Sequence, residues 1–529
     1  MNSHLAYSQT IALQGLNGVV VDVETHLGPG LIGITLVGLP DASVREAKDR
    51  VRAALASCSI PAVNRKTTIN LSPAAVPKIG SSFDLAIAVS LLQAEGYLAQ
   101  AVSQDTIFAA ELGLDGSLRP CRGILPIATA AKEHGFKRIV VAPGAQAEAN
   151  LAKLEVVPCA SLQLLLETFK DGDKPAAKWA KIAAQSQMAE EEQQSELFAM
   201  PAPAPAETDL AEVRGQNRAV QALLLAGAGG HHVLFHGEPG CGKSMLASRL
   251  GGILPELDDG QALKLAMVRS LAERLDQQFE LDHRAPVEIV HPHVTMSALL
   301  GGGNPLRPGA ISLANHGVLV LDEAPEFSTH CLDSLRQPLD QGRVTLHRQA
   351  QRATFPAQFQ LILTANPCAC GARSQVELQI AKTCKCTPAS RIRYQSRLTG
   401  SLLDRIDIQI EMRQPTKKAL QEPAIDTQTA REQVHEARKR ALFRWNHFQG
   451  VPSLNARISG TVLRQFGHLP EGFTEALTSA IERGAITMRG ADIILRLAWT
   501  NADLAGRAAP NDEDIYLATS MRENLYGNY

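Results

Sequence analysis

One glycine-rich segment constrains the fold of this chain more than any other feature of its 529 residues. Residues 232–236 have the apolar, β-rich composition of a buried strand, and residues 245–250 continue with apolar residues at helical spacing. The segment between them reads Gly237-Glu238-Pro239-Gly240-Cys241-Gly242-Lys243-Ser244. A strand, a glycine-rich loop and a helix in this order are typical of a phosphate-binding loop in an α/β fold, whereas a chance glycine-rich turn needs neither flank.

The chemistry of this loop predicts its ligands. Its glycines let the backbone curl so that successive N–H groups and the N-terminus of the helix point at phosphate oxygens. In such a loop Lys243 reaches the β- and γ-phosphates, and Ser244 holds Mg²⁺. We therefore expect ATP and Mg²⁺ as cofactors, bound by residues 237–244.

Two further apolar runs end in polar side chains that suit the same chemistry. Residues 317–321 lead into Asp322 and Glu323, and residues 360–365 lead into Asn366. Asp322 is the candidate Mg²⁺-side residue, Glu323 the general base, and Asn366 the amide that orients the attacking water. Alone, Asn366 before a proline indicates a turn residue. Because ligands of parallel α/β sheets gather at the carboxyl ends of strands, we expect the three strands to lie side by side.

Composition narrows the class of protein. The 52 basic and 54 acidic residues nearly cancel, so any binding of a polyanion must come from local patches. No apolar run approaches the ~20 residues of a membrane span, and the first six residues hold no basic segment ahead of an apolar one. We therefore expect no membrane partner, a cytoplasmic location and reduced cysteines.

Four of the nine cysteines stand in two close pairs, Cys368-Ala-Cys370 and Cys384-Lys-Cys386. Four thiolates match the ligand set of a tetrahedral Zn²⁺ site, although paired cysteines in such sites are more often separated by two residues. Two interpretations remain open: a structural zinc knuckle within an insertion at 367–390, and four free thiols. No neighbouring base points to a catalytic metal.

The chain divides at a stretch rich in Ala, Glu and Pro, which predicts a flexible linker at 173–207. Strand and helix patterns alternate before it and predict an α/β domain at 1–172. The glycine-rich loop and the two runs described above belong to a second α/β domain at 208–415. Residues 416–529 are mostly helical by pattern and predict a helical lid.

Several motifs in a fixed order carry a resemblance to a known family. In the second domain they are the loop at 237–244, Leu-Asp-Glu at 321–323, Asn-Pro-Cys-Ala-Cys-Gly at 366–371 and the segment at 397–407. In the first domain they are the segments at 37–51, 70–74 and 77–88. Together these motifs resemble the magnesium-chelatase-like AAA+ ATPases of the ComM/YifB family over nearly the whole chain. The resemblance implies a Lon-protease-like N-terminal α/β domain, an AAA+ P-loop α/β domain and a C-terminal helical lid.

The resemblance also implies an activity. It is that of an ATP-driven, ring-forming, hexameric DNA motor that promotes branch migration during homologous recombination of incoming DNA, as in natural transformation. Further copies of the chain and branched, single-stranded and double-stranded DNA would be its partners. A chelatase-type ATPase that remodels a protein partner and a regulator of an ATP-dependent protease are the alternatives.

Two arginines match functional positions of this family. Arg405 resembles its arginine finger, which reaches the γ-phosphate bound by a neighbouring subunit, and Arg489 resembles its second sensor. A guanidinium supplied in trans stabilises charge on the transferred phosphoryl group. The alternative for each is a structural ion pair, for Arg405 with Asp404 or Asp407.

The Lon-protease-like N-terminal domain matches the nucleophile position of Lon but not its partner lysine. Ser82 stands where Lon has its nucleophilic serine, but the segment at 123–132 has apolar residues where the partner lysine would lie. A serine without a base is a weak nucleophile. We therefore expect a non-proteolytic domain that acts as a scaffold or a DNA-binding face.

The candidate DNA contacts lie between the two strands that end in the polar residues. The segment at 342–352 alternates as a hairpin and carries Arg343, Arg348 and Arg352 without an acidic residue. Such a hairpin predicts salt-sensitive, sequence-independent contact with DNA phosphates. Solvated arginines on a surface hairpin are the other interpretation. The glycine-rich segment at 299–305 resembles the family's inserted pore loop.

Overall fold

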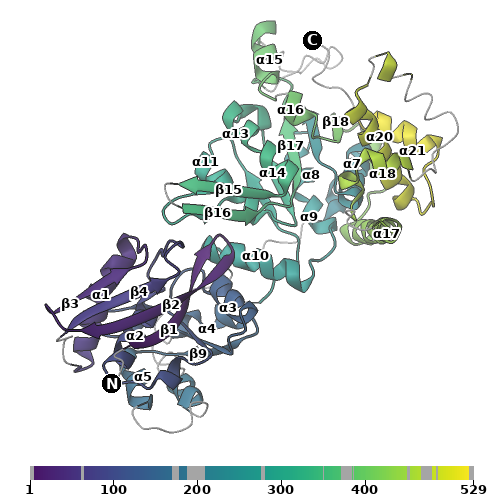
Figure 1. The fold of residues 1–529 in the computed structure, drawn as a ribbon. Coiled ribbons are helices and arrows are strands. Elements are labelled where there is room, and N and C mark those ends of the chain that lie inside the picture. The colour runs from purple at the N-terminus through teal and green to yellow at the C-terminus, as the bar shows by residue number, and fades with distance from the viewer. Residues whose placement is uncertain are drawn as a thin grey trace.

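The structure, a computed structural model, describes residues 5–60, 65–169, 178–186, 209–275, 280–348, 351–370, 384, 386–398, 400–448, 453–465, 479, 481–483 and 486–522. Two α/β bodies follow one another along the chain (Figure 1). The first, drawn in purple and blue, precedes the linker, and the second, in teal and green, contains the glycine-rich loop. The yellow C-terminal helices lie on the side of the second body that faces away from the first.

The N-terminal body contains two larger sheets. The first has the strand order β1-β2-β4-β3, and the second, β5-β8-β9, is parallel throughout. Helix α2 contacts β1, β2 and β5 and is buried along most of its length, because nearly all its residues are apolar. The strands are β1 (Leu5–Gln14), β2 (Asn17–Gly28), β3 (Gly33–Val37), β4 (Lys66–Ser72), β5 (Thr106–Ala109), β6 (Glu111–Leu112), β7 (Leu118–Arg119), β8 (Arg138–Val141) and β9 (Glu155–Pro158). The helices are α1 (Ala42–Ser57), α2 (Asp84–Ala94), α3 (Ile124–Glu133), α4 (Gln146–Asn150) and α5 (Leu162–Phe169).

The predicted linker at 173–207 needs a correction at 178–186, which is helical. Trp179 is 1% exposed and lies in the core of the N-terminal body, with its ring edge-on to Phe169 at 4.6 Å between centroids. The Ser186 hydroxyl accepts a hydrogen bond from the Ala160 N–H at 3.0 Å. One tryptophan buries enough apolar surface to dock a short helix, so the Ala-rich composition is a poor guide here. Residues 173–177 and 187–207 of this prediction lie outside the described residues.

The second body is built on a five-stranded parallel sheet with the order β11-β14-β17-β10-β18. Strands β10, β14 and β17 are buried over their whole length, which is why they read as continuous apolar runs. The strands are β10 (Val233–Gly237), β11 (Val287–Val290), β12 (Gly301–Gly302), β13 (Arg307–Pro308), β14 (Val318–Leu321), β15 (Arg343–Arg348), β16 (Gln351–Pro356), β17 (Gln360–Ala365) and β18 (Ile408–Met412). The helices are α7 (Asn217–Gly229), α8 (Lys243–Ser248), α9 (Leu250–Ile253), α10 (Asp259–Leu271), α11 (Met296–Leu300), α12 (Ala310–Leu313), α13 (Thr329–Ser334), α14 (Arg336–Gln341), α15 (Pro388–Gln395) and α16 (Gly400–Leu403).

The C-terminal segment is helical, as predicted, and packs on α7 of the sheet domain. Its helices are α17 (Thr427–Trp445), α18 (Gly460–Gln465), α20 (Met488–Leu504) and α21 (Asp512–Ser520). A buried polar network ties α17 to α20: Arg444 donates to the Asp503 carboxylate, which also accepts from Asn455. The α/β fold with a helical C-terminal region is thus confirmed. Within the described residues, no helix is both long and apolar enough to span a membrane.

Helix α10 joins the two bodies. Its residues Ala266 and Met267 lie in the same apolar cluster as α3 of the N-terminal body. The half-buried Glu148 carboxylate accepts from the Ser270 hydroxyl at 2.6 Å and from the Leu125 N–H at 3.0 Å. Burial raises the pKa of Glu148. Because apolar packing and a part-buried hydrogen bond both cross this junction, the N-terminal body is held against the second body.

Candidate nucleotide-binding site

The glycine-rich loop follows β10 and leads into α8, in the order that its sequence predicts. Gly240 and Gly242 have φ angles of +81° and +90°, which turn the chain before the helix. Gly237 admits no side chain, because a Cβ there would lie 2.2 Å from the Met412 carbonyl oxygen at the end of β18. These glycines let the backbone form a compact cradle at the carboxyl end of the sheet.

Lys243 crosses the mouth of this cradle. Its Nζ donates to the Gly237 and Glu238 carbonyl oxygens at 2.8 and 2.9 Å, and to Asn366 Oδ1 at 3.0 Å. Burial lowers the pKa of Lys243, and the nearby carboxylates of Asp322 and Glu323 oppose this effect. The ammonium is thus placed between the loop and the end of β17, where a polyphosphate would replace these oxygens as its partner.

The predicted carboxylates lie opposite the loop, at the end of β14. Asp322 Oδ1 accepts hydrogen bonds from the Ser244 hydroxyl and the Thr364 hydroxyl, both at 2.7 Å. The Glu323 N–H donates to Thr364 Oγ1 at 2.9 Å, while Glu323 itself adopts the left-handed conformation with a φ of +56°. A non-glycine residue in this conformation is strained, and such strain is typical of functional sites.

The three strands lie side by side, as the sequence predicts. In the sheet, β17 pairs with β14 on one side and with β10 on the other, so their ligand-bearing ends meet. A hydroxyl and a carboxylate in contact, Ser244 and Asp322, form an oxygen set that suits Mg²⁺, which keeps several waters of its own. The residues present therefore fit a magnesium–nucleotide complex. Their individual roles stay predictions.

Three family models cover most of the chain. The model of magnesium chelatase subunit ChlI matches residues 209–420, a second ChlI model matches 23–145, and the ChlI C-terminal model matches 424–522. YifB of Escherichia coli is 34% identical over 505 residues, covering 94% of this chain and 93% of that protein. The chain belongs to the magnesium-chelatase-like AAA+ family of YifB and ComM. Membership of this AAA+ family implies ATPase activity.

Two further relatives also match this chain over nearly its whole length. An uncharacterized protein of Mycobacterium tuberculosis is 37% identical over 519 residues, covering 97% of this chain and 98% of that protein. Competence protein ComM of Haemophilus influenzae is 34% identical over 509 residues, covering 96% of this chain and 94% of that protein. The resemblance noted in the sequence therefore holds for both bodies and the helical segment.

The four paired cysteines of this chain lie close together in the structure. Their Sγ atoms all lie within 4.8 Å of one another, with Cys368 at 3.2 Å from Cys370 and at 3.4 Å from Cys384. Four sulfurs at the Zn–S distance of ~2.3 Å around a tetrahedral ion lie about 3.8 Å apart, so the cluster is close to that geometry. Cys386 completes the set. The cluster begins two residues after Asn366. Within the predicted insertion at 367–390, residues 371–383 and 385 lie outside the described residues.

We expect the purified protein to carry one Zn²⁺ per chain, and the double substitution of Cys368 and Cys384 by serine to remove it. Two remaining thiols cannot close a structural site. Metal analysis of the purified chains measures this directly. Cys58→Ser is the matched control, because Cys58 lies outside the cluster and should leave the zinc content unchanged. Wild-type protein without zinc would establish four free thiols.

Arg405 lies at the opposite end of the sheet from its own P-loop. It stands between α16 and β18, and two residues later the Asp407 N–H donates to the His232 carbonyl oxygen just before β10. The five residues of β10 span about 17 Å. Arg405 is therefore too far from its own P-loop to contact a nucleotide bound there.

The expected ion-pair alternatives for Arg405, Asp404 and Asp407, are wrong. Arg405 instead forms a bidentate pair with Asp340, with Nε to Oδ1 at 2.8 Å and Nη2 to Oδ2 at 2.6 Å. This bond raises the pKa of Arg405 and lowers that of Asp340. Asp407 contacts His231 at 2.9 Å. Asp340 is 65 residues away along the chain, so sequence proximity was a misleading guide.

Arg489 is exposed near the start of α20 and lies on the same side as Arg405. A Cβ on the next residue, Gly490, would lie 3.9 Å from Arg522 Nε, and Arg522 donates to the Ile406 carbonyl oxygen at 3.3 Å. The pKa of Asp340 is lowered mainly by the hydrogen bond from Arg405, and the positive charge of Arg489 lowers it further. The C-terminal segment therefore places the charge of Arg489 near Asp340, the partner of Arg405.

The predicted hairpin forms from β15 and β16, but its arginines divide between two faces. Cross-strand partners share a face, and the pairs are Arg343 with Pro356, His347 with Arg352, and Arg348 with Gln351. Arg343, His347 and Arg352 therefore share one polar face. Arg348 belongs to the other face, whose Val344, Leu346, Ala353 and Phe355 pack in the interior. All three arginines are exposed.

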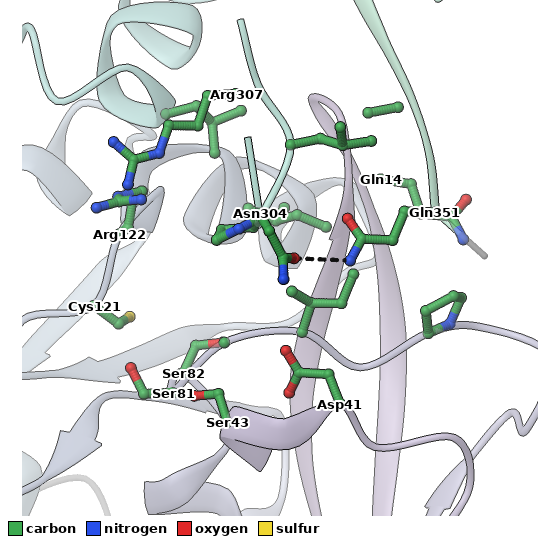
Figure 2. Close-up of a pocket in the computed structure, with 18 of the residues that line it drawn as sticks. Gln14, Asp41, Ser43, Ser81, Ser82, Cys121, Arg122, Asn304, Arg307 and Gln351 are labelled. Carbon is green, nitrogen blue, oxygen red and sulfur yellow. Dashed lines mark hydrogen bonds between the residues drawn. The ribbon is translucent and has the colours of Figure 1, made fainter. Parts of the chain in front are cut away.

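A cleft of about 1030 Å³ lies between this hairpin and the N-terminal body, which also pack against each other where Phe355 meets Leu13 and Leu16. Its roof includes Asn304, from the predicted pore loop, which accepts a hydrogen bond from Gln351 at 3.2 Å (Figure 2). Ser82 lies on its floor beside Ser81 and Ser43 (Figure 2). Among the described residues that line the cleft there is no lysine or histidine. That the N-terminal domain is non-proteolytic stays a prediction.

Sequence analysis did not identify two residues that contact the predicted site residues. Thr364 donates to the Asp322 carboxylate and accepts from the Glu323 backbone N–H. Its signal was a lone hydroxyl residue inside the apolar run of β17, two positions before Asn366. Asp340 holds Arg405 and carried no such signal, because it reads as one more exposed acid near the end of a short helix.

Proposed function

We propose that the protein is an ATP-driven DNA motor that assembles into a hexameric ring and promotes branch migration during recombination of incoming DNA. One observation supports the ring above others. The P-loop of each chain lies at one end of the sheet, and the candidate finger Arg405 lies at the other end. A site divided in this way is complete only when a second copy supplies the arginine.

The chain's own residues divide the work of hydrolysis. The loop N–H groups and Lys243 hold the β- and γ-phosphates, and Ser244 with Asp322 holds Mg²⁺, which offsets phosphate charge when bound. The Glu323 carboxylate accepts a proton from the attacking water, which the Asn366 amide orients. Arg405 and Arg489 of a neighbouring copy stabilise the charge that develops on the γ-phosphate.

Three observations support DNA as the substrate. The hairpin holds Arg343 and Arg352 on one exposed face together with His347. Neither arginine pairs with an acidic group in the part of the chain that the structure describes, so both charges are available to phosphates. A full-length relative is named a competence protein, which connects this family with DNA uptake.

A purified-protein assay on a synthetic four-way DNA junction tests the proposal. We expect ATP-dependent conversion of the junction to duplex products, and none with a non-hydrolysable ATP analogue. The family models named after magnesium chelatase favour a second candidate, an ATPase that remodels a protein partner, and a protease regulator is the third. Intact ATPase activity in assembled rings without junction movement would support these and reject the DNA motor.

Removing the two face-sharing arginines should weaken DNA binding without affecting ATP binding. For the double variant Arg343→Ala with Arg352→Ala, we expect the slope of log affinity against log salt to fall by about 1.4, since each phosphate contact on single-stranded DNA contributes about 0.7 to it. Fluorescence anisotropy with labelled single-stranded DNA measures the slope. Lys418→Ala removes an exposed charge outside the hairpin and is the control. An unchanged slope would mean that these arginines are merely solvated.

A further inference from the structure

The most informative contact outside the P-loop is the one that holds Arg405. Resting on the proposed trans role of Arg405, we propose that Asp340 is a positioning residue that withholds the finger from the neighbouring nucleotide until the DNA-facing hairpin moves. Asp340 would thereby couple DNA contact in one subunit to hydrolysis in the next.

All three nitrogens of the Arg405 guanidinium donate hydrogen bonds within its own chain. Nε and Nη2 donate to the two carboxylate oxygens of Asp340, and Nη1 donates to the Ser401 carbonyl oxygen at 2.6 Å. A finger must direct these same donors at phosphate oxygens. In the observed arrangement Asp340 neutralises the charge and occupies the fork, so the arginine is held in a non-productive position.

Asp340 is connected to the hairpin by a very short segment. Helix α14 ends at Gln341, Gly342 adopts the left-handed conformation with a φ of +64°, and β15 begins at Arg343. The Ala357 N–H closes the base of the hairpin by donating to the Gly342 carbonyl oxygen at 2.8 Å. The exposed arginine face therefore starts three residues from the carboxylate that holds the finger, and a displaced hairpin displaces Asp340.

The strength of the pair suits a switch. The Arg405 side chain is 19% exposed and that of Asp340 is 49% exposed, so water screens the interaction. Partly exposed pairs of this kind shift an equilibrium by up to about fivefold, which a DNA contact at the hairpin can overcome. A fully buried pair would require a far larger change to open.

The opposite role for Asp340 predicts the opposite result. If the carboxylate held Arg405 in its productive orientation, its removal would lower the rate of hydrolysis. If it withholds the arginine, removal raises the rate in the absence of DNA and leaves little for DNA to add. The sign of the change in basal kcat therefore separates the two roles. If Asp340 has a purely structural role, its removal would change neither the basal kcat nor the stimulation by DNA.

The first experiment measures ATP hydrolysis by assembled full-length protein with and without single-stranded DNA. For Asp340→Asn we expect a basal kcat about fivefold above wild type, a DNA stimulation ratio near one and an unchanged KM for ATP, since its own P-loop is intact. Asp333→Asn is the matched control, because this carboxylate on the adjacent helix α13 pairs with Arg336. The control should behave as wild type. A basal rate at or below wild type in Asp340→Asn overturns the proposal.

The second experiment tests the trans direction. Chains carrying Lys243→Ala with Asp340→Asn are mixed with Arg405→Ala chains, so that only a finger from the first can serve a P-loop of the second. We expect a higher rate than with Lys243→Ala chains that keep Asp340, and equal rates would overturn the clamp. Failure of the proposed function gives different results. Mixtures that show no complementation at all reject the arginine finger, and wild-type protein whose ATP hydrolysis is not stimulated by DNA rejects the DNA motor. In either case the basal rate of Asp340→Asn still tests whether Asp340 withholds Arg405.

Discussion

Replacing Glu323 with glutamine should slow ATP hydrolysis by about two to four orders of magnitude and leave ATP binding intact. The amide keeps the shape and the hydrogen-bonding reach of the side chain but cannot accept a proton from water. Ser244 and Asp322 are unchanged in this variant, so the site should still hold the magnesium nucleotide. Steady-state turnover measures the loss, and a fluorescent ATP analogue measures the retained affinity.

A nearby carboxylate provides the control for this variant. Glu326 lies three residues further on and pairs with Arg397 at 3.4 Å, away from Asp322. Glu326→Gln should hydrolyse ATP at close to the wild-type rate. Because Glu323→Gln binds ATP without splitting it, we also expect it to accumulate as an ATP-bound ring, which mass photometry detects. Turnover near the original rate would show that another group is the base.

Replacing Arg405 with alanine should lower kcat by about a thousandfold, the smaller end of the effect of a finger supplied in trans. The KM for ATP should change little, because Arg405 lies at the far end of the sheet from its own P-loop. The decisive measurement is complementation. An equal mixture of Arg405→Ala chains and Lys243→Ala chains should recover activity, since each supplies what the other lacks.

The same experiment has a clear contrary outcome. If Arg405 only forms an ion pair with Asp340, Arg405→Ala chains alone retain their turnover, and mixing them with Lys243→Ala chains adds no activity. Sedimentation of the wild-type chain with ATP tests the underlying assembly, because a chain that stays monomeric with every nucleotide cannot use a finger in trans. Arg45→Ala is a suitable control for the loss of a guanidinium, since it is exposed on α1 of the N-terminal body.

The nucleotide site was predictable because its geometry is local. A glycine-rich turn between a strand and a helix presents its N–H groups in one way only, so Gly237, Lys243 and Ser244 needed no tertiary information. The convergence of Asp322 and Asn366 on this loop followed from the rule that parallel strands place their carboxyl ends at one edge. The four cysteines were likewise paired closely enough in sequence to predict their cluster.

Contacts between distant segments were not predictable in this way. The partner of Arg405 was expected among neighbouring acids, yet it is Asp340 on another helix. The helix at 178–186 was expected to be linker, yet Trp179 docks it into the N-terminal core. Both outcomes depend on which surfaces meet after folding, and a charge or an aromatic ring has the same appearance in sequence whether it is paired or solvated.

The order of residues along the chain was enough to establish the phosphate-binding chemistry, the α/β architecture and the membership of a family, because each depends on short-range pattern. Folding in three dimensions decided the rest: which end of the sheet carries Arg405, which face of the hairpin carries Arg343, and which carboxylate holds the finger. The reason is physical. Strand direction and pleat assign side chains to ends and faces only once the sheet order and register are set by packing.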